Sequence, residues 1–196
     1  MKEQSLSAYL RQLASESSTP GGGSVGGSLG AHAAALMAMV NQLSAKKPEI
    51  DSRLGAFTNR LLDLAEADIA AFKKVSEAYQ IDKSRSEERK SAIQLALRQC
   101  TEVPCQLAET AAELAVFFDE HIDQINTNVL SDAAIAMEVL KCTLATSEWN
   151  LRINFKFLKD TDFKKEILER YRTAKASIQR VTSQHLAKFE LELPEL

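Results

Sequence analysis

One carboxylate of this sequence stands among apolar residues, where acid–base chemistry would need it. Between residues 50 and 80, side chains recur every three or four positions at Leu54, Phe57, Leu61, Leu64, Asp68, Phe72 and Val75. This spacing predicts one face of an α-helix, with Asp68 in its middle. Loss of water raises the pKa of a carboxyl toward neutrality, which suits proton transfer. Asp68 is therefore a catalytic candidate, and the alternative is a structural aspartate that caps or bridges neighbouring helices.

A second candidate is the glycine-rich segment STPGGGSVGGSLG at residues 18–30. Pro20 stops any earlier helix, and Ser24 is expected to cap the helix that follows. Backbone N–H groups at a helix start attract negative charge or acceptor oxygens. The candidate substrate-binding residues here are Gly21, Gly22, Gly23 and Ser24. Glycines repeated every four residues also let another helix approach closely, so packing and binding both remain open.

Two other interpretations of the glycines fail. A phosphate loop would need GK[ST] after the glycines, and both it and a dinucleotide site would need a strand before them. The apolar run from Val25 to Val40 contains glycines, a serine and His32. Sixteen such residues are too short and too weakly apolar for a membrane span.

Further polar candidates accompany a later apolar helix. In NTNVLSD, residues 126–132, Asn128 or Ser131 is expected to cap that helix, and Asp132 lies on its small-residue face. Asn154 follows on the same face, and its buried amide would need either a structural partner or a ligand's amide or carbonyl group. Lys46, at the end of an earlier helix, suits the helix dipole and could meet an anionic substrate tail.

The composition predicts an all-α protein. Five of the seven glycines lie within residues 21–27 and there are only four prolines, so breakers are rare elsewhere. We expect helices at 4–16, 25–45, 50–80, from 86 onward, 104–119, from 128–131 to 157, and 161–190. Pro104 should kink the fourth helix or start a new one. The 196 residues suit one domain, 1–196, folded as an antiparallel up-and-down bundle.

Several classes of protein are disfavoured. A formal charge of −3 gives no basic field for nucleic acid. Cys100, Cys105 and Cys142 lack zinc or disulfide spacing, and the three histidines are too far apart in sequence to suggest a metal triad. The N-terminal segment has no signal-peptide apolar core. We expect a cytoplasmic protein without a metal and without a membrane or nucleic-acid partner.

In this order, STPGGGSV, DIAAF…AY, EER…AIQLAL…EVP, NTNVLSDAAIA and NLRINFKFLKD resemble the cyclodeaminase family. That family includes the cyclodeaminase domain of formiminotransferase-cyclodeaminase and bacterial methenyltetrahydrofolate cyclohydrolases. The resemblance runs from residue 5 to about residue 170. Relatives usually carry alanines in place of Gly26, Gly27 and His32, and a glycine in place of Ile125.

The resemblance implies an all-helical homodimer that acts on a tetrahydrofolate derivative without a metal or redox cofactor. A cyclodeaminase closes formiminotetrahydrofolate to methenyltetrahydrofolate and releases ammonia, whereas a cyclohydrolase opens the methenyl ring with water. Asp68 with Phe72 matches the family's DxxxF stretch, whose aspartate is a proposed acid/base. Glu66 is the alternative, because it stands where relatives carry another aspartate.

On this hypothesis Asp68 moves protons, and the turn from Gly21 to Ser24 holds the substrate across a cleft. The residues expected to bind the pterin or orient the acid are Asn128, Ser131 and Asp132, which makes Asp132 the second catalytic candidate. The rival hypothesis is a non-catalytic helical dimer that binds folate or a protein partner.

Overall fold

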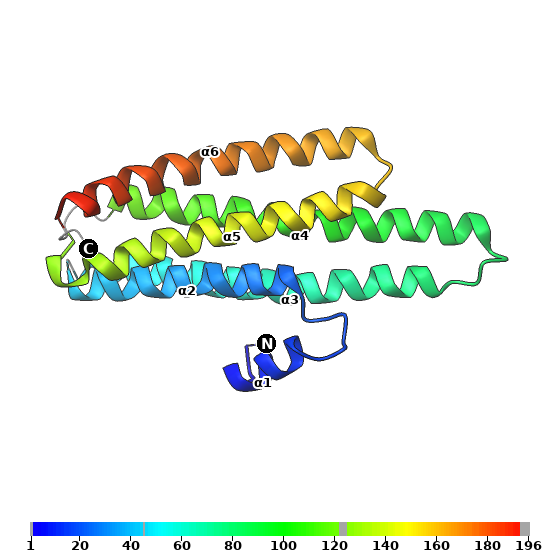
Figure 1. The fold of residues 1–196 in the computed structure, drawn as a ribbon, viewed down its shortest axis with the longest axis horizontal. Coiled ribbons are helices and arrows are strands. Elements are labelled where there is room, and N and C mark those ends of the chain that lie inside the picture. The colour runs from blue at the N-terminus through cyan, green and yellow to red at the C-terminus, as the bar shows by residue number, and fades with distance from the viewer. Residues whose placement is uncertain (1, 45, 122–124, 193–196) are drawn as a thin grey trace.

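The computed structural model describes residues 2–44, 46–121 and 125–192. Its helices are α1 (Leu6–Leu13), α2 (Gly22–Leu43), α3 (Pro48–Gln80), α4 (Ser86–His121), α5 (Leu130–Phe157) and α6 (Thr161–Glu192), with a 3₁₀ turn, η1 (Thr127–Val129), before α5. No strand occurs among these described residues, so the all-α prediction is confirmed (Figure 1).

Most helix limits fall near the expected ones, with three differences. The first helix is shorter than 4–16, and α2 begins inside the glycine segment, at Gly22, instead of after it. The fourth helix runs unbroken through Pro104 to His121. Part of the loop expected before α5, residues 122–124, lies outside the described residues.

The predicted helix caps are wrong at two places. Gly21, in extended backbone, is the N-cap of α2, so Ser24 already lies inside that helix. Val129 precedes α5 without any side-chain cap, whereas Asn126 caps η1 by accepting the N–H of Asn128. In both cases the chain enters the helix one to three residues away from the best capping side chain.

Helix α2 lies between α3 and α5, and its glycines are the points of closest approach. A Cβ on Gly27 would lie 2.8 Å from the carbonyl oxygen of Leu61, and a Cβ on Gly26 would lie 2.3 Å from Oγ1 of Thr146. As residue numbers increase along α2, the residue numbers of the contacts on α3 and α5 decrease. On α3, Gly23, Gly27 and Gly30 meet Asp68, Ala65 and Leu61, and on α5, Gly22, Gly26 and Gly30 meet Asn150, Thr146 and Thr143. Close packing is thus confirmed as one role of the glycines.

The bundle is longest along α3 and α4, and α2 begins only part of the way along α3. Beyond that point the α3–α4 hairpin extends past the other helices, while α1 lies outside the bundle below α2 and α3 (Figure 1). Leu54, Leu61 and Met37 have no exposed surface and belong to the common core. The start of α2 therefore lies partway along the bundle, between α3 and α5.

By length and composition, one helix among the described residues, α2, could cross a membrane. It has 22 residues, so the expectation that this segment is too short and too weakly apolar for a span is wrong by these two criteria. Inside the bundle, 56% of the most apolar stretch of α2 is buried. The glycine contacts with α3 and α5 account for that burial.

Candidate functional site

The Asp68 carboxyl closes the N-terminus of α2. It comes from α3, and a Cβ on Gly23 would lie 2.0 Å from its Oδ1 atom, so only glycine fits at that position. The backbone N–H of Ser24 donates a hydrogen bond to the same carboxyl. This N–H belongs to the first turn, where a helix leaves donors without an internal acceptor. Asp68 therefore performs the structural role that the sequence left open.

Burial also suits Asp68 to proton transfer. Loss of water raises the pKa of this carboxyl to about 6, while the hydrogen bond from Ser24 acts in the opposite direction. The direction agrees with the expectation from the apolar stripe. A carboxyl with this pKa is present in both protonation states near neutral pH, as an acid–base catalyst requires.

Glu66, the alternative carboxylate, has a different environment. Its Oε1 atom accepts a hydrogen bond from the backbone N–H of Lys2, at 3.1 Å. Such a bond favours an ionised carboxylate. Of these two carboxylates, Asp68 is the one that lies next to α2 and is sheltered from water.

Ser24 shapes the turn from inside. Its side chain has no exposed surface, and its hydroxyl donates to the carbonyl of Gly21 at 2.8 Å. The same hydroxyl lies 3.2 Å from the phenolic oxygen of Tyr9, a buried residue of α1. The sequence pattern assigned no role to Tyr9. With these partners, the Ser24 side chain holds the glycine turn and α1 together.

Near the start of α2, α4 and α5 are joined by a buried contact. Cys100 of α4 is 5% exposed. The pKa of its thiol is raised to about 11, first by burial and second by the charge of Asp68. Asn154 of α5 donates from Nδ2 to the carbonyl oxygen of Cys100 at 3.1 Å. Asn154 thus has the structural partner that the sequence analysis considered, and that analysis assigned no role to this partner, Cys100.

The other predicted site residues lie at the opposite end of α2. Asn126 donates from its side chain to the carbonyl of Leu43, which places the loop before α5 against the last turn of α2. Asn128, Ser131 and Lys46 are exposed there, and Asp132 is partly buried. A helix of 22 residues at 1.5 Å per residue is roughly 33 Å long. Within one chain, these four residues are therefore not brought together with Asp68.

Asp68 packs directly on Gly23, so the carboxyl and this glycine are in contact, and the cleft expected at the glycine turn stays a prediction. A groove of about 590 Å³ lies among α3, α4 and α6, with Phe57, Phe117 and Arg170 in its lining. Two smaller cavities of about 140 and 80 Å³ are also lined by residues other than Asp68. The described part of the chain shelters the Asp68 carboxyl on one side and leaves the other side of that carboxyl open.

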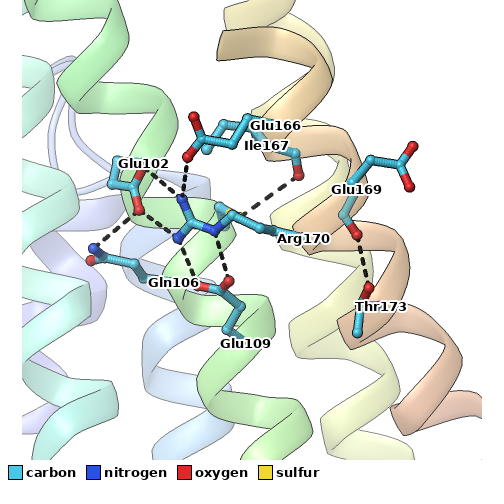
Figure 2. Close-up of polar contacts among 9 residues, drawn as sticks. Glu102, Gln106, Glu109, Glu166, Ile167, Glu169, Arg170 and Thr173 are labelled. Carbon is cyan, nitrogen blue, oxygen red and sulfur yellow. Dashed lines mark hydrogen bonds and ion pairs between the residues drawn. The ribbon is translucent and has the colours of Figure 1, made fainter. Parts of the chain in front are cut away.

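The groove borders a charged clamp between α4 and α6. Figure 2 shows Arg170 reaching from α6 toward Glu102 and Glu109 of α4. Its Nη2 atom lies 2.6 Å from Glu102, and its Nε atom lies 2.8 Å from Glu109. Bonds to Glu109 and then Glu102 raise the pKa of the guanidinium further above its usual range. Because Arg170 already has three carboxylate partners, Glu102 and Glu109 of α4 and Glu166 of its own helix, we interpret it as a clamp across the turn of α4 that contains Pro104.

Comparison with known proteins gives this site a context. Residues 5–173 match the formiminotransferase-cyclodeaminase family. Formimidoyltransferase-cyclodeaminase of Mus musculus is 33% identical over 177 residues, which cover 84% of this chain and 33% of that protein. The chain thus spans about a third of the length of that relative.

A relative of similar length and a solved structure agree. Methenyltetrahydrofolate cyclohydrolase of Methylorubrum extorquens is 31% identical over 179 residues, covering 85% of this chain and 86% of that protein. The crystal structure of formiminotetrahydrofolate cyclodeaminase from Thermotoga maritima superposes with a TM-score of 0.85 at 29% identity, over 96% of each chain. The resemblance read from the motifs is confirmed, and this chain belongs to the formiminotransferase-cyclodeaminase family.

Proposed function

We propose that this chain is an enzyme of folate one-carbon chemistry, either a formiminotetrahydrofolate cyclodeaminase or a methenyltetrahydrofolate cyclohydrolase. The family assignment and the names of its relatives support the substrate class. The observation that carries the chemistry is the Asp68 carboxyl, which is sheltered against Gly23 with its pKa raised to about 6 by burial.

Both reactions pass through a tetrahedral carbon between two folate nitrogens, and both need a proton to be moved. For ring closure, Asp68 would take the proton that the attacking folate nitrogen loses as its bond to the carbon forms, and donate it to the amino nitrogen that departs as ammonia. For ring opening, ionised Asp68 would take a proton from the attacking water and then return it to the ring nitrogen that is released, while the remaining hydroxyl proton leaves to solvent as the formyl carbonyl forms. Neither reaction oxidises or reduces the substrate, so proton transfer by side chains is sufficient.

The direct test follows the near-ultraviolet absorbance of methenyltetrahydrofolate, starting from either substrate. We expect Asp68→Asn to lower turnover at least about 100-fold, in the range that general acid–base residues supply. Asp63→Asn is the matched control, because Asp63 lies on the solvent side of the same helix. Unchanged turnover in Asp68→Asn would remove Asp68 from the mechanism. A parent protein that neither binds nor converts folates would support the non-catalytic alternative.

We also propose that the protein is a homodimer of antiparallel up-and-down bundles, joined along the uncovered face of α2. His32 is exposed on that face, and Leu43 is 49% exposed. In α1, which lies outside the bundle, Leu6 and Leu10 are 60% and 50% exposed. Exposed apolar side chains that recur along helices in this way are typical of association surfaces.

A two-fold axis through the middle of the α2 face would place the C-terminal end of α2 in one subunit beside the N-terminal end of α2 in its partner. The far end of one subunit, with Asp132 and Lys46, would then lie beside Asp68 of its partner and cover the open side of that carboxyl. This arrangement would let Asn128 and Ser131 bind the pterin and Lys46 meet the glutamate tail, as the sequence analysis expected.

Mixing two inactive variants tests the shared site. If each site takes Asp68 from one chain and Asp132 from the other, Asp68→Asn mixed with Asp132→Asn should recover about a quarter of parental activity. Half of the dimers would be mixed, and each mixed dimer would have one intact site. Either variant alone should stay inactive. An active Asp132→Asn homodimer, or mixtures without recovery, would contradict the shared site.

A further inference from the structure

Pro104 leaves a gap in the hydrogen-bond ladder of α4. The helix continues through this residue, but a proline has no N–H to give to the carbonyl four residues earlier. That carbonyl belongs to Cys100. Since Cys100 is 5% exposed, its oxygen needs a partner from within the protein.

Asn154 supplies the partner from another helix. Its Nδ2 atom lies 3.1 Å from the carbonyl oxygen of Cys100 and 3.9 Å from the Cys100 sulfur. One turn earlier, Asn150 bonds the Thr146 carbonyl of its own helix and faces Gly22 at the start of α2. Of these two amides, Asn154 is the one that joins α5 to α4.

The α4–α5 contact lies one turn from the Asp68 site, because Asn150 packs on Gly22 while Asp68 packs on the next residue, Gly23. The charge of Asp68 is the second cause, after burial, of the raised pKa of the Cys100 thiol. This thiol is uncharged at neutral pH and lies away from water. It therefore forms a dry side of the environment in which the carboxyl titrates.

We propose that Asn154 is a positioning residue, which holds the carbonyl that Pro104 leaves free and so fixes Cys100 as a dry side of the Asp68 environment. The inference rests on the proposed function, in which Asp68 carries the proton. Without the Asn154 amide, the exposed carbonyl would draw water into the α4–α5 contact. The Asp68 pKa would then fall from about 6 toward its ordinary 3.8.

Pro104 provides the decisive comparison. In Pro104→Ala, the new N–H can reach the Cys100 carbonyl within α4, so Asn154 is no longer needed for that bond. We would titrate the Asp68 side chain by carbon-13 NMR in four proteins: the parent, Asn154→Ala, Pro104→Ala and the double variant. Asp68→Asn assigns the signal, and Asn59→Ala, an exposed amide change on α3, is the matched control.

We expect Asn154→Ala to lower the Asp68 midpoint by about one pH unit in the parent and by less than about 0.3 unit in the Pro104→Ala background. The acid limb of the turnover profile should move with the midpoint. An unchanged midpoint, or equal shifts in both backgrounds, would overturn the proposal.

If Asn154→Ala does not fold, the double variant should fold and titrate like Pro104→Ala, and its failure to do so would also overturn the proposal. The NMR titration needs no turnover. A parent protein without folate activity would therefore refute the proposed function while the role of Asn154 is still measured.

Discussion

Asp68 combines two roles that place opposite demands on its charge. As an acceptor at the start of α2, it is favoured when ionised, through the Ser24 N–H and the positive end of the helix dipole. As a sheltered carboxyl, it is favoured when protonated, and burial is the larger of the two causes. At neutral pH the ionised Asp68 carboxylate therefore destabilises the folded state, and such costs are typical of functional sites.

This conflict predicts that Asp68→Asn stabilises the fold at neutral pH. Because the pKa of Asp68 is about 6 in the folded protein and 3.8 when unfolded, the folded state binds more protons between these values. Stability from this group is thus present below pH 3.8 and lost as pH rises through 6. The difference of about two units corresponds to about 3 kcal/mol, so we expect a gain of about 1–3 kcal/mol at pH 7.5.

Thermal unfolding followed by circular dichroism at several pH values measures this effect. The gain should shrink steadily toward pH 4, where Asp68 is protonated in the folded protein. Asp63→Asn should show no such trend. A destabilised Asp68→Asn protein at pH 7.5 would mean that the capping role outweighs the cost of burial.

At the residue level, the sequence identified the sheltered carboxyl but not its surroundings. Periodicity alone placed Asp68 on the inner face of α3. Cys100 was missed. Because a proline inside a helix frees the carbonyl four residues earlier, Pro104 could have indicated the carbonyl of Cys100. Ser24 was misjudged, because an N-cap depends on where the backbone leaves extended geometry, and Gly21 does so three residues earlier.

At the level of elements, the glycines of α2 determine how closely three helices pack. Gly23→Ala should displace the Asp68 carboxyl, since the new Cβ would lie 2.0 Å from Oδ1. We expect a loss of about 1–3 kcal/mol in stability, typical of overpacking, together with a turnover as low as that of Asp68→Asn. Denaturant unfolding and the absorbance assay measure the two effects.

Gly55 is the matched control, because nothing lies within 4 Å of the Cβ that alanine would add there in α3. Gly55→Ala should raise stability by about 0.5–1 kcal/mol through helix propensity alone. Equal effects of the two substitutions would show that α2 can move away from Asp68, and that the close contact is not required.

The helices themselves were predictable because the chain outside residues 21–27 has few breakers and clear apolar periodicity. Pro104 was the exception: the sequence allowed a kink or a new helix, but α4 continues. The reason lies in three dimensions, since Asn154 satisfies the freed carbonyl. No pattern local to α4 contains that information.

At the scale of the molecule, the long helices explain why the predicted site divides into two ends. Motifs at the start of α2 and before α5 look like parts of one site in the sequence, but a helix of about 33 Å separates them. The order of the motifs in the sequence could not reveal this separation, because the separation depends on which end of α5 packs against which end of α2. A second subunit that runs the other way is the simplest way to unite the two ends.

The proposed dimer predicts that a charge in the middle of the uncovered α2 face separates the subunits. His32 is exposed there, halfway along the helix, with Leu36 one turn later. In His32→Glu the two-fold axis would bring two like charges together in an apolar contact, at a cost of about 3–5 kcal/mol. We therefore expect dimer affinity to fall at least about 100-fold, with turnover falling as the protein is diluted. Sedimentation at several concentrations measures the mass, and Lys83→Glu, at the exposed α3–α4 turn, should leave it unchanged. A His32→Glu protein that keeps the mass of a dimer would place the subunit contact on a different face and leave the Asp68 carboxyl to be covered by the substrate alone.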